Sequence, residues 1–312
     1  MSKEKAFELG IANVTLESVM DDFVVFDKQS NQESNEKVSL DDVGITLTKG
    51  QSIETIEKEQ PFIYMSSSPT EEGPRNSVRL EGKTRFNRGL FIMDLSHMPS
   101  GCGTWPAFWL TDEQNWPING EIDILEGVNY QTRAKTALHA TKTCNMDDIP
   151  SGVRTGSWDT AVGIPDKKTG IPDMTVREAN DCFVYNPHQW LNQGCVTVDD
   201  NDGSIGEPLN DNGGGVYALE WDPINKRIRS WAFSSHSAVP ENLKLAISSA
   251  GNPLSSTQVS PDPNLWGLPF GYFAIGKLLL SFYAIIILLF THNILQCFMT
   301  NRGRHQLPKL SF

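Results

Sequence analysis

The chain has 312 residues, with 38 acidic against 26 basic side chains and a formal net charge of −12 at pH 7. This charge excludes a nucleic-acid partner, because phosphate binding needs a surface of clustered lysine and arginine. The 25 glycines and 18 prolines favour a loop-rich β protein over a helical one, and the length suits one large domain or two small ones.

Residues 1–60 form an atypical first segment. No apolar run that could serve as a secretory signal peptide follows the initial methionine. Residues 28–37 are polar throughout and indicate a loop, whereas residues 43–48 alternate between apolar and polar side chains as a strand does. We therefore expect this segment to be partly strand.

From residue 61 to residue 275, short apolar runs are separated by clusters of glycine, proline and asparagine, which is typical of an all-β domain. The predicted strands lie within residues 62–65, 77–80, 89–93, 121–126, 137–141, 216–221 and 229–233. We expect one domain over this range.

Three carboxylates, Glu121, Asp123 and Glu126, lie in a run that is otherwise too apolar for a surface loop. Side chains of a strand alternate between the two faces of a sheet, so Glu121 and Asp123 share a face and strict alternation turns Glu126 away. One extra residue, a β-bulge around Ile124 and Leu125, returns Glu126 to that face, and bulges are frequent beside active sites. The spacing thus predicts three acids on one wall.

Close acids of this kind suit the cleavage of glycosidic bonds. Mutual repulsion keeps one of the carboxyl groups protonated near neutral pH, as a general acid must be. Retaining glycosidases place the two carboxyl groups roughly 5 Å apart, a gap that near neighbours on one strand face can span. We therefore assign Glu121 as the nucleophile and Glu126 as the acid/base, with Asp123 between them tuning both pKa values.

The acidic outer face of an amphipathic strand would show the same spacing, but the flanking residues favour a site. Gly120 and Gly127 allow a ligand or another backbone to come close. Trp105, Trp109 and Trp116 lie just upstream, and flat aromatic rings can stack on the faces of a sugar.

The run Glu-Ile-Asp-Ile-Leu-Glu, residues 121–126, resembles the signature of glycoside hydrolase family 16, and its surroundings resemble the laminarinase, or endo-1,3(4)-β-glucanase, branch of fungi and protists. Further matching blocks span residues 75–79, 89–92, 97–99, 102–109, 138–139, 213–218 and 266–269. The resemblance implies a β-jelly-roll sandwich of the concanavalin A-like type with a long substrate cleft. It also implies the same roles for the three acids.

The resemblance implies sugar-binding residues as well: Trp109, Trp116 and His139 near the scissile bond and, as weaker matches, Trp105, Arg79 and Trp231. A lone histidine between apolar residues is commonly a core side chain, but the family match favours a subsite role for His139. Trp231 fits either the core or the floor of the cleft.

Residues 150–192 are predicted to form a long loop over the sandwich, where loops often shape specificity. Four of the five cysteines, at positions 102, 144, 182 and 195, fall inside the β domain and predict two disulfides in an oxidising compartment, with the pairing left open. The sequence has no Cys-x-x-Cys and its six histidines are scattered, so neither a metal nor another cofactor is expected.

Residues 276–312 form an apolar tail. Residues 278–290 carry no charge, and the stretch 278–299 is long enough to cross a bilayer as a helix, with basic residues following it on the cytoplasmic side. The rival interpretation is translated intron, because the codons of residues 276–278 can contain a splice donor and the family's closing strands are missing. Loss of those strands would expose a sheet edge and part of the core.

These features together predict a retaining endo-β-glucanase that hydrolyses 1,3- or mixed 1,3/1,4-linked β-glucan by double displacement. We expect a monomer that acts on a polysaccharide, faces the outside of the cell through the secretory pathway, and contacts the membrane only through the 278–299 helix. The alternatives are a non-catalytic β-glucan-binding protein and a cell-wall transglycosylase on the same fold.

Overall fold

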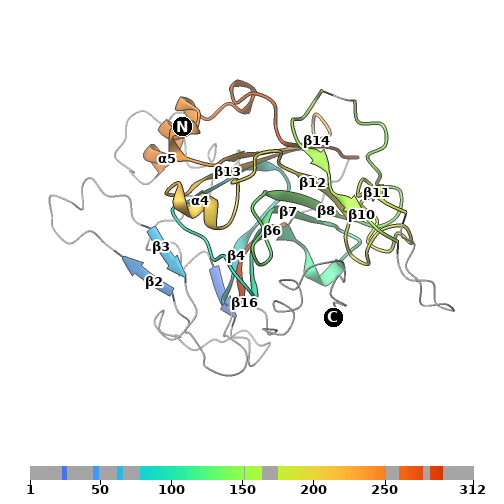
Figure 1. Cartoon of the computed structure of the whole chain (residues 1–312), viewed down its shortest axis with the longest axis horizontal. Coiled ribbons are helices and arrows are strands. Elements are labelled where there is room, and N and C mark those ends of the chain that lie inside the picture. Colours follow the sequence, from blue (N-terminus) through green and yellow to red (C-terminus); the bar gives the residue numbers. More distant parts are fainter. Residues whose placement is uncertain are drawn as a thin grey trace.

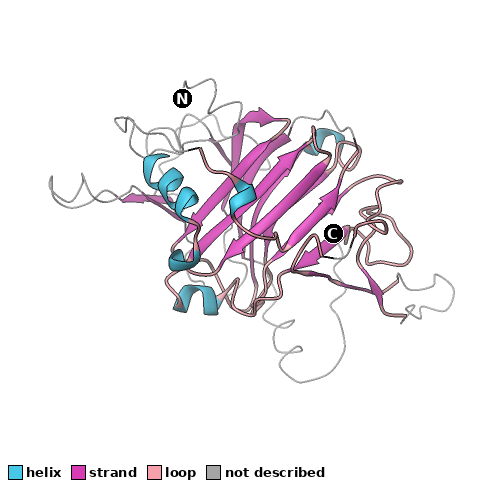
Figure 2. Cartoon of the chain, turned by 90° about the horizontal axis from the view of Figure 1, so that it is seen from above, coloured by secondary structure: helices cyan, strands magenta, loops and turns pink. Residues whose placement is uncertain are grey.

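The computed structural model describes residues 23–26, 45–48, 62–65, 78–150, 152–163, 175–250, 260–276 and 282–290. Within these residues two β-sheets lie one over the other, and the few helices lie beside them (Figure 1, Figure 2). Strands make up most of the regular structure, in agreement with the predicted all-β class.

The larger sheet has eight strands. In spatial order they are β1 (Phe23–Phe26), β4 (Val78–Phe86), β16 (Phe282–Phe290), β6 (Thr104–Thr111), β7 (Glu121–Glu126), β8 (Lys135–His139), β12 (Cys195–Val198) and β9 (Ser157–Trp158). Every neighbouring pair is antiparallel. Strand β7, which carries the three predicted acids, lies in the middle of this sheet.

The smaller sheet has four antiparallel strands: β15 (Gly271–Ala274), β14 (Arg227–Phe233), β13 (Gly215–Asp222) and β5 (Gly89–Leu95). The main core joins the two sheets, with Phe108 and Leu110 of β6 packed in one cluster with Leu219 of β13 and Phe273 of β15. Side chains alternate along β6 between these buried positions and half-buried ones. The half-buried set therefore lies on the face of the larger sheet that is turned away from the core, which we call the open face.

The remaining elements flank the sandwich. They are the two-stranded sheets β2 (Ile45–Thr48) with β3 (Phe62–Met65) and β10 (Thr160–Ala161) with β11 (Arg177–Glu178), the helices α4 (Glu207–Asp211) and α5 (Glu241–Ala250), and the 3-10 turns η1 (Glu113–Asn115), η2 (His236–Ala238) and η3 (Pro263–Leu265). Strand β2 confirms the strand expected in residues 43–48. The loop expected over residues 28–37 lies outside the described residues.

The apolar tail belongs to the larger sheet where the structure describes it. The helix predicted over residues 278–299 is wrong for residues 282–290, which form β16, antiparallel to β4 on one side and to β6 on the other. Three consecutive isoleucines favour this outcome, because β-branched residues are stiff in helices and common in strands. Among the described residues, no helix combines the length and the apolar character that crossing a bilayer requires.

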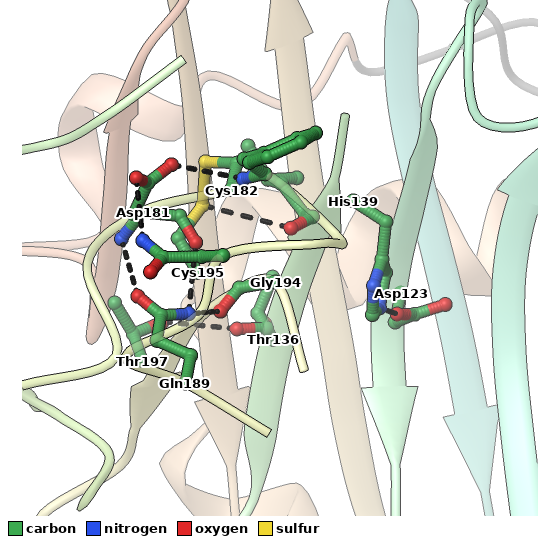
Figure 3. The surroundings of a disulfide bond; sticks show 12 residues. Asp123, Thr136, His139, Asp181, Cys182, Gln189, Gly194, Cys195 and Thr197 are labelled. Atoms are coloured by element: carbon green, nitrogen blue, oxygen red, sulfur yellow. Dashed lines mark hydrogen bonds and ion pairs between the residues drawn. A yellow bond between two sulfur atoms is a disulfide. The ribbon is translucent and has the colours of Figure 1, made fainter. Parts of the chain in front are cut away.

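The predicted cysteine pairing is correct only in part. Cys182 and Cys195 form a disulfide, with their Cα atoms 4.2 Å apart, and it ties the long loop to the start of β12 (Figure 3). Cys102 is also disulfide-bonded, whereas Cys144 is free. Only two of the four cysteines of the β domain therefore pair with each other, and the second disulfide expected among them does not form, because Cys144 is free.

Candidate active site

Strand β7 carries the predicted β-bulge. Against β6 its register shifts between Asp123 and Leu125, and against β8 it shifts between Asp123 and Glu126. Ile124 is the extra residue, and both it and Leu125 are 2% exposed in the core. The bulge is confirmed, and it returns Glu126 to the face that Glu121 and Asp123 share.

Glu126 lies on the open face of the larger sheet. Its Oε1 accepts a hydrogen bond from Nε1–H of Trp105 at 2.7 Å, and its register partner on β8 is Lys135. At the other end of the strand, Oε2 of Glu121 accepts a hydrogen bond from Oγ1–H of Thr111 at 3.4 Å. Each glutamate is thus held by a donor from the neighbouring strand β6.

Asp123 lies between the two glutamates and pairs with His139. Oδ2 of Asp123 is 2.7 Å from Nε2 of His139 (Figure 3), and the side chains are 6% and 11% exposed. His139 ends β8 and is the register partner of Glu121. The histidine is therefore both largely buried and part of the acidic cluster.

Burial and mutual charge set the protonation of this cluster. Burial raises the pKa of Glu121 to about 8 and that of Glu126 to about 7, and the charge of Asp123 adds to both shifts. Burial alone would lower the pKa of His139, but the charge and hydrogen bond of Asp123, with the two glutamates, outweigh it and raise this pKa to about 9. Near neutral pH the site thus holds an imidazolium and two glutamates that are at least partly protonated.

Glycines permit the close packing around the histidine. Gly120 has φ +85°, and a Cβ there would lie 3.1 Å from the carbonyl oxygen of His139. Gly194 has φ +68°, and a Cβ there would lie 2.9 Å from Nδ1 of the same histidine. At Gly127 the near atom belongs to the side chain of Ile205, 2.6 Å away. Close approach was predicted at Gly120 and Gly127, whereas Gly194 carries no local signal in the sequence.

The loop between β6 and β7 is built around a buried carboxylate, Asp112, which was not predicted from the sequence. Asp112 is 3% exposed, and its Oδ2 accepts hydrogen bonds from Arg85 at 3.0 Å, Asn115 at 3.1 Å and Asn119 at 2.7 Å. This loop carries Trp116, whose indole Nε1 is buried and has no hydrogen-bond partner among the described residues. The Asp112 contacts thereby fix the segment that presents Trp116 and leads into β7.

Two of the predicted sugar-binding tryptophans, Trp105 and Trp109, lie beside the three acids. Trp105 contacts Glu126, and Trp109 is the register partner of Asp123, so both lie beside the acids on β6. Arg79 lies on β4 at a position whose side chain is outside the described part of the chain. The structure therefore brings two of the three upstream tryptophans directly to the acids.

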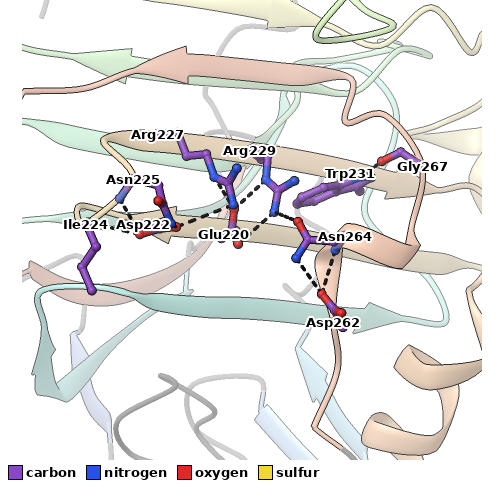
Figure 4. A network of polar contacts seen from close by, with 10 residues as sticks. All are labelled: Glu220, Asp222, Ile224, Asn225, Arg227, Arg229, Trp231, Asp262, Asn264 and Gly267. Carbon is purple, nitrogen blue, oxygen red and sulfur yellow. Dashed lines mark hydrogen bonds and ion pairs between the residues drawn. The ribbon is translucent and has the colours of Figure 1, made fainter.

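Trp231 belongs to a different hydrophobic cluster. It lies on β14 of the smaller sheet, is 3% exposed, and stacks edge-on against Trp266 with ring centres 5.2 Å apart. On the same strand, the Arg229 guanidinium lies over its ring and pairs with Glu220 at 2.6 Å (Figure 4). Trp231 is a core residue, and its assignment to the substrate site is corrected.

One cation-ligand set overlaps with the acidic cluster. Single ligand atoms of Glu121, Asp123 and His139 lie within 4.8 Å of one another. However, imidazole must be neutral to bind a metal, and the raised pKa of His139 keeps it protonated near neutral pH. These three side chains are therefore better suited to proton transfer than to metal binding.

Residues 45–285 match a family model described as the XgeA-like catalytic domain of glycoside hydrolase family 16. The chain is 38% identical over 203 residues to a probable glycosidase of Schizosaccharomyces pombe, covering 65% of this chain and 39% of that protein. It is 40% identical over 196 residues to the endo-1,3(4)-β-glucanase xgeA of Emericella nidulans, covering 61% and 26%. The chain thus spans well under half the length of these curated relatives.

Solved structures show a similar fold. One, an elongating β-1,3-glucosyltransferase of the same family, matches with a TM-score of 0.63 and 26% identity over 90% of this chain and 82% of that one. Another, laminarinase 16A of Phanerochaete chrysosporium with β-glucans in its donor and acceptor sites, matches with a TM-score of 0.53 and 28% identity over 77% and 72%.

Proposed function

Because the chain belongs to glycoside hydrolase family 16, we propose that it is a retaining endo-β-glucanase acting on 1,3- or mixed 1,3/1,4-linked β-glucan. The observation that carries this proposal is the bulge at Ile124, which turns three acids to one open face. The name of the Emericella nidulans relative and the β-glucans bound to laminarinase 16A support the substrate class.

The reaction proceeds by double displacement. The Glu121 carboxylate attacks the anomeric carbon while Glu126 gives its proton to the leaving oxygen, so the glycosidic C–O bond breaks and a glycosyl ester of Glu121 forms. Glu126 then takes a proton from water, whose oxygen attacks the anomeric carbon and releases Glu121. The negative charge passes from Glu121 to Glu126 in the first step and returns in the second, beside Asp123 and the imidazolium of His139 that pairs with it.

The proton must sit on Glu126 when sugar is bound. Without substrate, Glu121 holds a proton more tightly than Glu126 does, because the pKa of Glu121 is about 8 and that of Glu126 is about 7. The glycosidic oxygen accepts a hydrogen bond only from protonated Glu126, and the electropositive anomeric carbon favours ionised Glu121. Substrate binding therefore favours the state in which Glu126 carries the proton and Glu121 is ionised.

The sugar rings stack on tryptophans beside the acids. Trp105 and Trp109 flank the trio on β6, and Trp116 is presented by the loop before β7. The Trp116 ring is half-buried, so part of its flat face is left for a sugar to stack on. We place all three in the substrate subsites.

The chain works outside the reducing part of the cell. The buried Cys182–Cys195 disulfide persists only in an oxidising compartment, such as the secretory pathway or the cell surface. An extracellular polysaccharide is the substrate that such a location offers.

A transglycosylase is the second candidate, and the similarity to an elongating β-1,3-glucosyltransferase favours it. Both activities share the glycosyl ester of Glu121 and differ in whether water or a sugar hydroxyl attacks it. Incubation with a concentrated laminari-oligosaccharide separates the two, because a transglycosylase makes products longer than its substrate.

Release of reducing ends from laminarin tests the proposal. We expect Glu121→Gln and Glu126→Gln to lower the rate by at least about 10³-fold, whereas Glu241→Gln, a change of an exposed glutamate on α5, leaves it unchanged. Equal rates for wild type and Glu121→Gln would contradict the assignment. Binding of laminarin without any turnover by the wild type would favour the non-catalytic binding protein.

A further inference from the structure

Lys135 is the residue of β8 directly opposite Glu126. Directly opposed residues of an antiparallel pair project from the same face, with Cβ atoms roughly 5 Å apart. Burial and the charge of Asp123 raise the pKa of Glu126, and the charge of Lys135 opposes them. A lysine therefore adjoins the acid/base on the open face.

A flap lies on the same face. It consists of the paired strands β10 and β11 together with Asp159, which precedes β10, and Ala179, which follows β11. Ala161 and Ala179 of the flap pack against Ala137 of β8 and Val196 of β12, and all four side chains are buried. Three of the four are alanines, which let the flap backbone approach the sheet closely. The flap thus covers the open face at the side of the acids.

Asp159 joins this flap to Lys135. Its Oδ2 accepts a hydrogen bond from Nζ of Lys135 at 2.5 Å, and its Oδ1 accepts one from N–H of Thr160 at 2.8 Å. Its own N–H donates to the carbonyl oxygen of Val196, and its carbonyl oxygen accepts from N–H of Ala179, both at 2.8 Å. The carboxylate is therefore held in place by its backbone on both sides.

An ion pair whose side chains are 32% and 25% exposed contributes little to stability by itself. Its place beside the acid/base suggests a different role. We propose that Lys135 and Asp159 are positioning residues for Glu126. The lysine places a positive charge beside the acid/base, and the aspartate of the flap partly neutralises that charge and so weakens its effect on Glu126. This inference rests on the proposed role of Glu126.

The groups that act on Glu126 are Asp123 and Glu121 on its own strand, His139 and Lys135 on β8, Trp105 on β6 and, through Lys135, Asp159 on the flap. Lys135 and Asp159 can be changed without removing an acid or a direct hydrogen bond of Glu126. Removal of the lysine charge favours the protonated form of Glu126, whereas removal of the aspartate charge favours the ionised form. The two changes therefore act in opposite directions.

The test is the pH dependence of kcat on a laminari-oligosaccharide, because kcat reports the substrate-bound enzyme, in which Glu126 carries the proton. We expect the alkaline limb, which follows loss of the Glu126 proton, to move up by about 0.5–1 pH unit in Lys135→Met and down by a similar or smaller amount in Asp159→Asn. Lys135→Arg keeps the charge and restores the wild-type limb. A purely structural latch would lower the melting temperature in both charge-removing variants and move the two limbs the same way.

Shifts of the same sign, or no shift in either variant, would overturn the inference. If Asp159→Asn does not fold, the contrast between Lys135→Met and Lys135→Arg decides. The carboxyl carbon signal of Glu126 in NMR titrations gives the same comparison without turnover. A wild type that does not hydrolyse glucan would therefore refute the proposed function while this test still stands.

Discussion

Glu121 and Glu126 are held more protonated in the folded chain than they would be in the unfolded chain. Their pKa values rise from an ordinary 4.5 to about 8 and about 7, and that of His139 rises from 6.5 to about 9. A group with a raised folded-state pKa stabilises the fold fully below its unfolded pKa and loses this contribution as pH rises through the folded value. All three residues therefore make the fold less stable as pH rises from about 5 to about 9.

Glu121→Gln should flatten this pH dependence. Glutamine does not ionise, so we expect the variant to be more stable than wild type by about 1–2 kcal/mol at pH 8 and to show no gain at pH 4.5. Urea unfolding at several pH values measures the difference, with Glu241→Gln as the exposed control. An unchanged pH slope in Glu121→Gln would mean that burial of this carboxyl has no energetic cost.

At the residue scale, the three acids were predicted from the sequence, whereas the residues around them, such as Asp112 and Lys135, were not. Glu121, Asp123 and Glu126 are visible because acids in an apolar strand break the usual pattern. Asp112 and Lys135 lie in ordinary polar contexts, and their partners are far away in sequence, 27 residues for Arg85 and 24 for Asp159. Such contacts arise from tertiary packing, which no local pattern encodes.

At the scale of elements, the loop from Asp112 to Gly120 should control substrate binding more than chemistry. In Asp112→Ala the donors of Arg85, Asn115 and Asn119 lose their shared acceptor, at a cost of about 1–3 kcal/mol in the free energy of unfolding. Because this loop presents Trp116, we expect KM on laminarin to rise several-fold with a smaller change in kcat.

Denaturant unfolding and steady-state kinetics measure these two effects. Asp148→Ala, in an exposed turn between β8 and β9, is the matched control and should leave stability and KM unchanged. A fall in kcat at constant KM in Asp112→Ala would instead assign the loop a part in the chemical steps.

Elements with alternating side chains were predicted well, and the apolar tail was not. The bulge followed from the spacing of three acids, and strands such as β13 and β14 followed from their alternation. Residues 282–290 are apolar without alternation, and such a run fits a buried strand and a helix equally well. Whether these residues form a strand or a helix depends on their tertiary neighbours. Strands β4 and β6, about 170–210 positions earlier in the chain, leave room for one strand between them.

At the scale of the whole molecule, β16 completes the larger sheet. It pairs on both sides, so its backbone N–H groups are needed for the ladders to β4 and β6. Ile286→Pro removes one of these donors from a central strand and should cost about 3 kcal/mol or more. Ile286→Val keeps the donor and should cost about 1 kcal/mol or less.

Thermal unfolding followed by circular dichroism compares the two variants. Equal melting temperatures for Ile286→Pro and Ile286→Val would show that this segment contributes nothing to the sheet. A large difference would show that β16 holds β4 and β6 together in the larger sheet.

The account as a whole depends on Glu121 being the nucleophile of a retaining site. Incubation with a 2-deoxy-2-fluoro laminaribiosyl dinitrophenyl glycoside, followed by proteolysis and mass spectrometry, tests this most directly, because such a substrate traps the glycosyl ester. We predict a single labelled peptide that contains residues 121–126, with the fluorosugar attached to Glu121. Attachment to Glu126, or turnover of glucan with inversion and no label, would contradict it.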